Sequence, residues 1–178
     1  MLGALAPPGV TLPELLVVLA LVATVTLVAV PDWRAALDDV RAWAWQRELV
    51  DALDRARARS RIEGRPVLVC GGAEGRACDP EGWADGWVVA EAGAERVAAG
   101  EPVPRERTLE RGRAAGARHH VAANRGVRDG VLFDPGTLWV TPGTFTLCRD
   151  GEALGAVVVS SLGRVRAEAG DSAACPRE

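Results

Sequence analysis

The chain has 178 residues, of which 48% are hydrophobic and 25% charged, and its formal net charge is −3. This composition suits one folded domain with a modest core. It excludes a polytopic membrane protein, a disordered chain and a globally basic nucleic-acid-binding protein. All 21 basic residues are Arg, which excludes reactions that require a Lys, such as those of a P-loop or a Schiff base.

The sequence contains no catalytic motif. There is no GxSxG nucleophile motif, and His119 and His120 have no HExxH context. We therefore predict a protein that is not an enzyme and has no catalytic, cofactor-binding or metal site.

The N-terminal part of the chain is almost uncharged. Within residues 10–30 the only formal charge is that of Glu14. At about 1.5 Å per residue, this run forms a helix about 31 Å long, which matches the hydrocarbon core of a bilayer. We therefore predict a membrane-spanning helix over residues 10–31. A cleaved secretory signal peptide is the alternative, but it requires a basic first segment, and residues 1–9 carry no charge.

A second helical stretch is predicted over residues 32–63. It is rich in good helix formers, and Gly64 and Pro66 mark its end. Its many charged residues, among them an Arg at every second position over residues 55–61, are expected to form a solvated face, with a nucleic-acid role as the alternative. Apolar or small residues recur in steps of three to five, which indicates one stripe that packs on a globular head. The stripe consists of Trp33, Leu37, Val40, Ala44, Leu49, Leu53, Ala56 and Ser60.

The remaining residues, 64–178, predict a β-rich head. Short apolar segments separated by Gly, Pro and Asp are typical of an antiparallel sheet or of two packed sheets. With the long helix before them, they place the chain in the α+β class. Trp83 and Trp87 are expected in the core, because each buries a large apolar area. The expected strands cover residues 67–70, 87–91, 118–122, 131–133, 144–148, 156–160 and 164–168.

Charge is segregated within the head. Residues 74–101 hold seven acidic residues and two Arg, a net charge of −5, whereas residues 105–128 hold seven Arg and two Glu, a net charge of +5. We expect the second segment to be a long loop that leads into a strand. Three interpretations remain open: a solvated loop, a surface for phosphate backbones, or a docking surface for the acidic segment of a neighbouring subunit.

The four cysteines, Cys70, Cys78, Cys148 and Cys175, lack the CxxC spacing of zinc sites. An even number of cysteines in an exported domain indicates disulfides. Of the three connectivities we favour Cys70–Cys78, which closes a short segment, and Cys148–Cys175, which holds the C-terminal tail. Unpaired buried thiols are the alternative.

Residues 9–16, GVTLPELL, resemble the class III leader motif of type IV pilins and of type II secretion pseudopilins. In that motif a short leader ends in Gly, a hydrophobic residue follows, and Glu stands at the fifth mature position. The resemblance implies that prepilin peptidase removes residues 1–9 between Gly9 and Val10 and that Val10 is N-methylated. It also implies that Glu14 pairs with the terminal amine of a neighbouring subunit. Here the leader lacks its usual basic residues, Val10 replaces the commoner Phe, and Pro13 precedes Glu14.

The second half of the chain is similar to the GspH/FimT family of minor pilins and pseudopilins. Residues 83–89, WADGWVV, are similar to its WxxGW segment, and residues 143–148 and 157–166 are similar to its last strands. The resemblance implies a type IV pilin-like fold, in which a long N-terminal helix packs on an antiparallel head.

Gly163, Arg164 and Arg166 form a GRxR motif. In an extended segment, residues i and i+2 share a face about 6–7 Å apart, so two guanidinium groups can contact successive backbone phosphates. In FimT-type members the motif belongs to DNA binding during natural transformation, and the resemblance implies that Arg164 and Arg166 contact phosphates. An ordinary strand with two solvated Arg is the alternative.

The expected function is that of a minor pilin that is assembled into, or primes, a type IV pilus and binds double-stranded DNA without sequence preference. A minor pseudopilin of the type II secretion system and a membrane-anchored adhesion or binding domain are the alternatives. The expected partners are other pilins or pseudopilins, prepilin peptidase, the inner membrane and DNA. We expect a single span in the bacterial inner membrane with a periplasmic head, which later enters the pilus or pseudopilus.

Overall fold

The computed structural model describes residues 11–72, 77–93, 102–170 and 175, and for residues 27–36 and 38 it describes the backbone alone. The chain divides into two units, Met1–Asp38 and Asp39–Glu178. We call the second unit the head. Gly9 and Val10, the predicted cleavage and methylation sites, lie outside the described residues.

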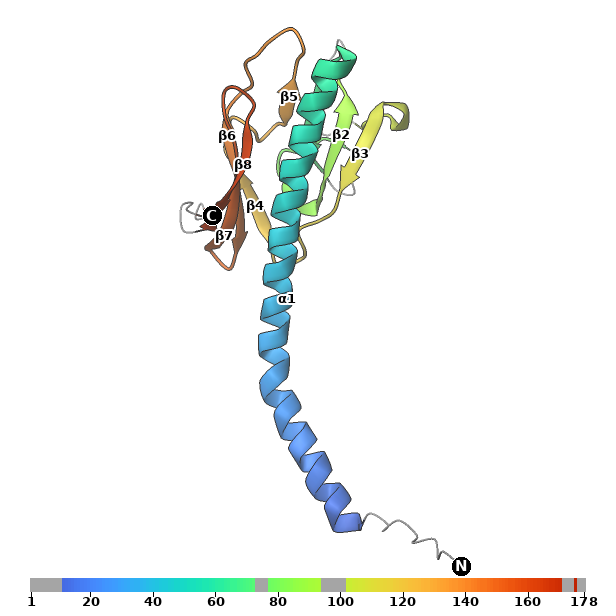
Figure 1. Cartoon of the computed structure of the whole chain (residues 1–178), viewed down its shortest axis with the longest axis vertical. Helices are drawn as coiled ribbons and strands as arrows, with labels where there is room; N and C mark the ends of the chain where they lie inside the picture. The colour runs from blue at the N-terminus through green and yellow to red at the C-terminus, as the bar shows by residue number, and fades with distance from the viewer. Residues whose placement is uncertain (1–10, 73–76, 94–101, 171–174, 176–178) are drawn as a thin grey trace, which may run out of the picture. The chain divides into compact units, whose positions relative to one another are not determined.

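A single helix, α1 (Leu12–Glu63), occupies the N-terminal third of the chain (Figure 1). Glu14 lies in its first turn. The two predicted helical stretches therefore join, and Pro31 lies within the helix. The helix ends at Glu63, and the next residue, Gly64, has a φ of 64°, the left-handed conformation that commonly terminates helices.

Among the residues described with side chains, no helix is both long and apolar enough to cross a membrane. Residues 10 and 27–31 of the predicted span lie outside those described with side chains.

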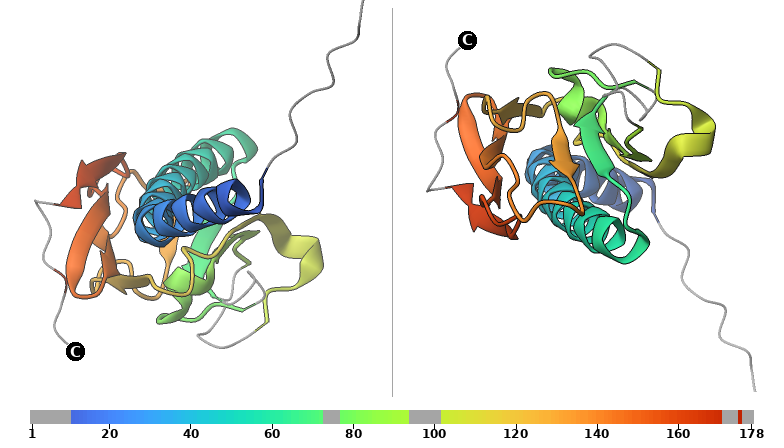
Figure 2. Two further views of the ribbon diagram at one scale, coloured as in Figure 1. Left: turned by 90° about the horizontal axis from the view of Figure 1, so that it is seen from below. Right: turned by 90° about the horizontal axis from the view of Figure 1, so that it is seen from above.

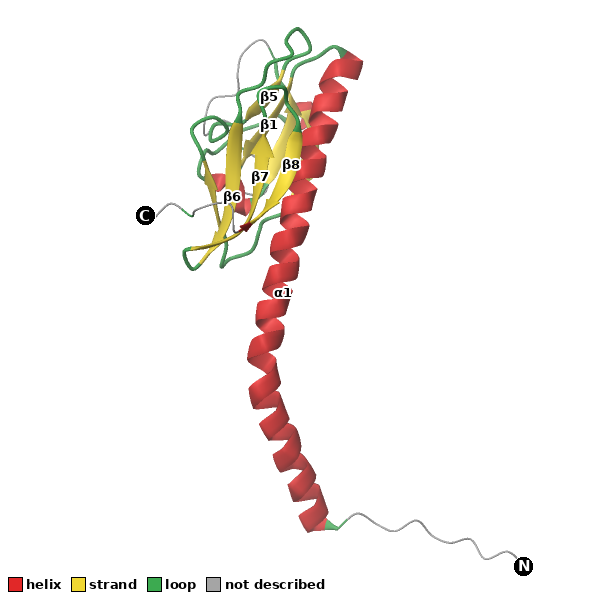
Figure 3. Ribbon diagram, turned by 60° about the vertical axis from the view of Figure 1, so that its left-hand side comes forward, coloured by secondary structure: helices red, strands yellow, loops and turns green. Residues whose placement is uncertain are grey.

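The head contains two antiparallel four-stranded sheets, which flank its part of α1 (Figure 2). The first sheet has the order β3-β2-β1-β5, and the second has the order β4-β6-β7-β8. Figure 3 shows β6, β7 and β8 of the second sheet beside α1. The strands of the first sheet are β1 (Val67–Gly71), β2 (Trp87–Glu91), β3 (Thr108–Gly112) and β5 (Val131–Phe133). Those of the second are β4 (His120–Ala123), β6 (Gly143–Arg149), β7 (Glu152–Val159) and β8 (Val165–Ala169).

The predicted loop over residues 105–128 is wrong in part, because it contains β3. This edge strand pairs with β2 through its backbone, while its side chains are half-buried or exposed, so no apolar alternation marks it. The strand also needs Gly112, since a Cβ there would overlap the Trp87 ring. The next strand, β4, begins two residues later than predicted.

The core lies between α1 and the two sheets. Trp83 and Trp87 are both fully buried, which confirms the prediction. The Trp87 ring packs edge to face against that of Trp45 on α1, with the ring centroids 5.8 Å apart. The centroids of the Trp83 ring and of the Phe145 ring on β6 are 4.4 Å apart. The helix thus contacts the first sheet by aromatic packing.

The predicted stripe on α1 is confirmed from Leu49 onward and wrong at Leu37, Val40 and Ala44, while the Trp33 side chain lies outside the described residues. Its members from Leu49 to Ser60 are buried, but Leu37, Ala44 and Val40, the last of these 61% exposed, are not. The five-residue step from Ala44 to Leu49 turns the helix by about 140° beyond a full turn, so the two halves lie on different faces. The helix side chains that face the core ahead of Leu49 are those of Ala42, Trp45 and Gln46.

Two side chains of α1 donate hydrogen bonds to the backbone of the strands. The Gln46 Nε2 group donates to the carbonyl oxygens of Ala156 on β7 and Glu168 on β8, at 2.7 and 2.8 Å. At the other end of the head, Ser60 Oγ donates to the carbonyl oxygen of Phe133 on β5 at 2.8 Å. Each sheet therefore has its own hydrogen-bonded contact with the helix.

The structure contains two disulfides, Cys70–Cys78 and Cys148–Cys175, the pairing that the sequence favours. Their Cα atoms lie 5.3 and 6.0 Å apart. The second disulfide ties Cys175 to β6, the strand next to β7.

Candidate functional site

The GRxR motif begins in the turn that joins β7 to β8. The Gly163 N–H donates to the Ser160 carbonyl oxygen at 2.8 Å, and the Arg164 N–H donates to Ser160 Oγ at 3.0 Å. Gly163 has a φ of 69°, in the left-handed region that favours glycine. The turn is therefore held by its own hydrogen bonds, and it places Arg164 one residue before the strand.

The two arginines of the motif have different surroundings. Both are exposed, but Arg166 forms an ion pair with Glu168, which lies two residues further along the same face of β8, with an Nη2–Oε1 distance of 2.7 Å. Arg164 forms no side-chain ion pair with any described residue. Of the two predicted phosphate contacts, Arg164 therefore has an uncompensated charge, whereas that of Arg166 is balanced by Glu168.

Three segments meet at this end of the head (Figure 1). They are the last turns of α1, the β5–β6 loop over residues 134–142, and the β7–β8 turn. The Arg57 Nη2 group donates to the Leu162 carbonyl oxygen at 2.8 Å, and the Val140 N–H donates to the Ser161 carbonyl oxygen at 2.9 Å. A Cβ at Gly163 would stand 3.1 Å from Val140 Cγ2 and 3.3 Å from Arg57 Nε, so the glycine also permits this close packing.

Arginine and apolar side chains line a small hollow at this junction. We call them the arginine–leucine surface. Arg57 and Arg61 are one helical turn apart on α1, and neither forms an ion pair with a described residue. Leu138 and Leu162 are exposed. The surface consists of Arg57, Arg61, Leu138, Val140 and Leu162.

The sequence does single out Arg57 and Arg61, as part of the arginine run over residues 55–61, with a solvated face expected and a nucleic-acid role as the alternative. It gives no signal for Leu138 and Val140, because their position depends on the contact between the β5–β6 loop and the β7–β8 turn.

The arginines of residues 105–128 do not form one free basic surface. Arg113 pairs with Glu48 at 3.7 Å and Arg118 with Asp150 at 3.3 Å. Arg128 pairs with Glu81. The segment also runs from the edge of one sheet into the other, so its charges are spread over the head.

Two titrating groups on the helix are perturbed. Burial raises the pKa of the Asp54 carboxyl above its usual value, an effect that the nearby Arg57 charge opposes. A hydrogen bond to Glu110 of β3 raises the pKa of Arg55. Arg55 therefore stays charged and joins α1 to the first sheet.

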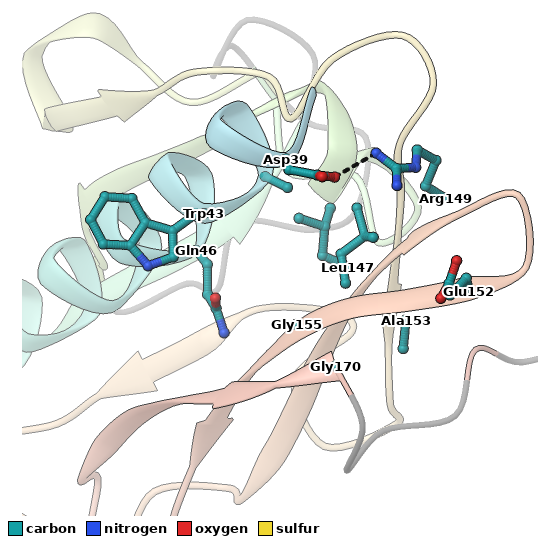
Figure 4. A pocket seen from close by; sticks show the side chains of 11 residues that line it. Asp39, Trp43, Gln46, Leu147, Arg149, Glu152, Ala153, Gly155 and Gly170 are labelled. Carbon is teal, nitrogen blue, oxygen red and sulfur yellow. Dashed lines mark hydrogen bonds and ion pairs between the residues drawn. The ribbon is translucent and has the colours of Figure 1, made fainter. Parts of the chain in front are cut away.

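A pocket of about 340 Å³ lies between α1 and the end of β6 and β7 (Figure 4). Asp39 and Arg149 form an ion pair across it at 2.7 Å, and Gln46 points toward Gly155 (Figure 4). Two of the three charged side chains that line the pocket are thereby paired, and the third is that of Glu152. Within the described residues, no group of three or more His, Cys, Asp or Glu side chains is placed to hold a metal ion.

The first half of α1 carries the predicted assembly residue, Glu14, on an apolar helix. Large apolar side chains from Leu12 to Val25 are more than half exposed. Within residues 11–26 Glu14 is the only charged residue.

The chain was compared with known proteins. Residues 46–163 match the family described as type II transport protein GspH. A comparison with curated protein sequences found no match.

Solved structures with a similar fold include two crystal forms of the type IV minor pilin FimU of Pseudomonas aeruginosa. One has a TM-score of 0.54 and 18% identity, and the similarity covers 75% of this chain and 91% of that chain. The other has a TM-score of 0.51 and 19% identity, with coverages of 75% and 96%. The minor pseudopilin EpsH of the Vibrio cholerae type 2 secretion system has a TM-score of 0.49 and 10% identity, with coverages of 73% and 96%.

The match to the family covers well over half of the chain, and the FimU structures share its combination of a helix with antiparallel sheets. The chain therefore belongs to the GspH family, and it is a minor pilin or pseudopilin with a type IV pilin-like fold.

Proposed function

We propose that the chain is a minor pilin of a type IV pilus, held in the inner membrane by residues 10–31 and then assembled into the filament through α1. The observation that carries this proposal is the run Leu15–Leu19, in which five successive apolar side chains are each more than half exposed. At 100° per residue, five successive positions cover the whole circumference of a helix. Such a helix needs lipid or other apolar helices on every side.

Glu14 gives this apolar helix its register in the proposed filament. An unpaired carboxylate in a membrane costs about 2.5–3.5 kcal/mol at the bilayer centre, so it is stable there only with a cationic partner. The terminal amine of a neighbouring subunit supplies that charge once the leader is removed before Val10. Pairing is then possible at one axial position, which aligns one subunit with the next.

The test is incorporation of Glu14→Gln into filaments, in cells that carry the pilus machinery. Sheared filaments and membranes are separated, and the full-length chain is quantified in each. We expect the variant to stay in the membrane and its filament fraction to fall about tenfold, which corresponds to about 1.4 kcal/mol. Thr24→Val is the matched control, because the Thr24 hydroxyl bonds only within its own helix. Equal incorporation of Glu14→Gln and wild type would contradict the proposal.

A minor pseudopilin of the type II secretion system is the second candidate, and the description of the matching family favours it. The two candidates share α1 and its assembly. They differ in what the head binds: DNA for the uptake pilus, and other minor pseudopilins for secretion.

For the pilus, the DNA contact proposed is Arg164, with Arg57 and Arg61 beside it. An exposed arginine without a carboxylate partner, held on a rigid turn, is suited to bidentate contact with a phosphate. Arg166 contributes once a phosphate displaces Glu168. Binding of this kind is independent of sequence and falls steeply as salt is raised.

Duplex DNA titrated with the full-length chain in detergent, at several salt concentrations, tests this contact. Arg164→Ala is expected to weaken binding. It should also reduce, by about one, the slope of the logarithm of the binding constant against the logarithm of the salt concentration. Arg125→Ala removes one exposed charge elsewhere on the head and is expected to leave the contact intact. Absence of binding at low salt would refute the DNA proposal and favour the secretion candidate. Binding that survives an Arg164→Ala/Arg166→Ala double variant would move the site to residues 105–128.

A further inference from the structure

Two arginines of the first sheet line one hollow. The hollow has a volume of about 260 Å³, and among the described residues its lining consists of Pro102, Val103, Arg105 and Arg111. Arg105 begins the short 3₁₀-helix η3 (Arg105–Arg107), and Arg111 lies on β3. Both arginines are exposed, and neither forms an ion pair with a described residue. Two uncompensated guanidinium groups therefore share one concave site.

This hollow lies on the face of the first sheet that is turned away from α1. Successive side chains of a strand point to opposite faces. Glu110 points toward α1, because its carboxylate accepts from Arg55 Nε at 3.1 Å, so the next residue, Arg111, points to the other face. Arg111 is paired with Val88 on β2, and Val88 and Val103 belong to one small buried cluster. The apolar side of the hollow is thus part of a packed cluster.

The backbone around Arg105 is held in place. Val103 is only 5% exposed. The Pro104 carbonyl oxygen accepts from the Arg107 N–H at 3.0 Å and from Thr108 Oγ1 at 3.1 Å. A site whose backbone is already fixed binds a ligand at a lower cost in conformational entropy.

The charges around the hollow favour a single carboxylate over a nucleic acid. Pro102 forms a bridge with Ala77, and the exposed Asp79 follows two residues after Ala77. Glu106, next to Arg105 in η3, is exposed and forms no ion pair with a described residue. A nucleic-acid backbone would bring further phosphates close to these acidic groups, and such like-charge contacts are unfavourable. A single carboxylate accepts hydrogen bonds from guanidinium groups and adds no further charge.

The hollow is also separate from the proposed DNA contact. It adjoins β3, in the first sheet, whereas Arg164 lies in the β7–β8 turn of the second sheet, and the two sheets flank α1 (Figure 2). A group bound in the hollow therefore lies on another side of the head than DNA bound at Arg164.

From these observations we infer that the hollow binds an acidic side chain of a neighbouring pilin or pseudopilin subunit. The carboxylate lies between the Arg105 and Arg111 guanidinium groups, and the methylene groups of that side chain contact Val103. The inference rests on the proposed assembly into a filament and adds a contact of the head to it. It holds for the pilus and for the secretion candidate alike.

A blocked Gly-Glu-Gly tripeptide is the first probe, because it carries one carboxylate. It is titrated into the ¹⁵N-labelled full-length chain in detergent, and the NMR signals of the arginine Nε–H groups are followed. We expect the signals of Arg105 and Arg111 to shift with one common dissociation constant. The same peptide with Gln in place of Glu should leave them unmoved.

An Arg105→Gln/Arg111→Gln variant should weaken the binding of this peptide about three- to tenfold. Both side chains are exposed and unpaired among the described residues, so urea unfolding of the variant should match that of wild type.

Arg107→Gln is the matched control. Arg107 is exposed and belongs to the same 3₁₀-helix, but it does not line the hollow. Its guanidinium lies against Gly93 instead, where a Cβ would stand 2.9 Å from Arg107 Nη1. The control removes one positive charge from the same helix, and it should leave the affinity for the peptide unchanged.

Incorporation into filaments tests the occupant of the site. The filament fraction of the Arg105→Gln/Arg111→Gln variant is measured in cells that carry the assembly machinery, in the same way as that of Glu14→Gln. We expect it to fall about three- to tenfold, while Arg107→Gln is incorporated like wild type.

The outcomes separate the inference from the function beneath it. Loss of peptide binding and of incorporation in the double variant, with neither loss in Arg107→Gln, supports the inference. Normal incorporation of the double variant, while Glu14→Gln stays in the membrane, overturns the inference and leaves assembly standing. Normal incorporation of both variants overturns both. The inference also fails if the Glu and Gln peptides act alike, or if duplex DNA shifts the Arg105 and Arg111 signals and the Glu peptide does not.

Discussion

Replacing Gln46 with Met tests how β8, the strand of the GRxR motif, is held on the head. The Gln46 amide donates to carbonyl oxygens on two strands, β7 and β8. It also lies directly on the β7 backbone, since a Cβ at Gly155 would stand 3.0 Å from Gln46 Cδ. Met keeps the length and packing of the side chain but removes both hydrogen bonds. At about 0.5–1.5 kcal/mol for each bond, the expected loss in the free energy of unfolding is about 1–3 kcal/mol.

The loss should be measured by urea unfolding of the full-length chain in detergent, together with amide hydrogen exchange. Exchange should accelerate most in β8, the outer strand that Gln46 contacts. Ser60→Ala is the matched control, because Ser60 bonds the other end of the helix to β5, and it should loosen the first sheet instead. A loss below about 0.5 kcal/mol, or the same exchange pattern in both variants, would refute the role given to Gln46.

Three further predictions concern charge and disulfides. Glu168→Gln frees Arg166 from its ion pair. The affinity for duplex DNA should therefore rise, and the dependence of its logarithm on the logarithm of the salt concentration should steepen by about one. Unchanged affinity would show that Arg166 does not contact the DNA. In urea unfolding, a Cys148→Ser/Cys175→Ser variant should lose about 3.5 kcal/mol of the free energy of unfolding, because this disulfide spans a sequence separation of 27. The Cys70–Cys78 disulfide spans a separation of only 8 and should contribute about 2.5 kcal/mol. The folded pKa of Asp54 lies above its unfolded value, so ionised Asp54 opposes folding at neutral pH, and Asp54→Asn should stabilise the head at pH 7. This increase in the free energy of unfolding should disappear as the pH falls through the pKa of Asp54 to about 4. If urea unfolding at that pH still showed the variant to be more stable, the raised pKa of Asp54 would not be its cause.

Much of the fold is encoded in local patterns. The bounds of β2 and β5 agree with those expected from apolar segments and their flanking turns. The burial of Trp83 and Trp87 follows from their size. The edge strand β3 lacks such a pattern, because it is held by backbone pairing to β2 while its side chains remain partly in water.

The candidate site was less predictable than the fold. The GRxR residues could be identified in the sequence by resemblance, but the ion pair between Arg166 and Glu168 depends on side-chain conformation. The approach of Arg57 to the β7–β8 turn depends on a contact between residues 105 apart in the chain, and the β5–β6 loop meets the same turn through Val140 and Ser161. Local periodicity carries no information about such contacts.

The proposal that this chain is a processed filament subunit predicts a specific N-terminus. The full-length chain should be co-expressed with a prepilin peptidase, and the mass of the purified product determined. The account predicts loss of residues 1–9 and a single methyl group on the amine of Val10. A product that keeps its leader, or that is cleaved at another site, would contradict the account, because Glu14 would then lack the terminal amine with which it is proposed to pair.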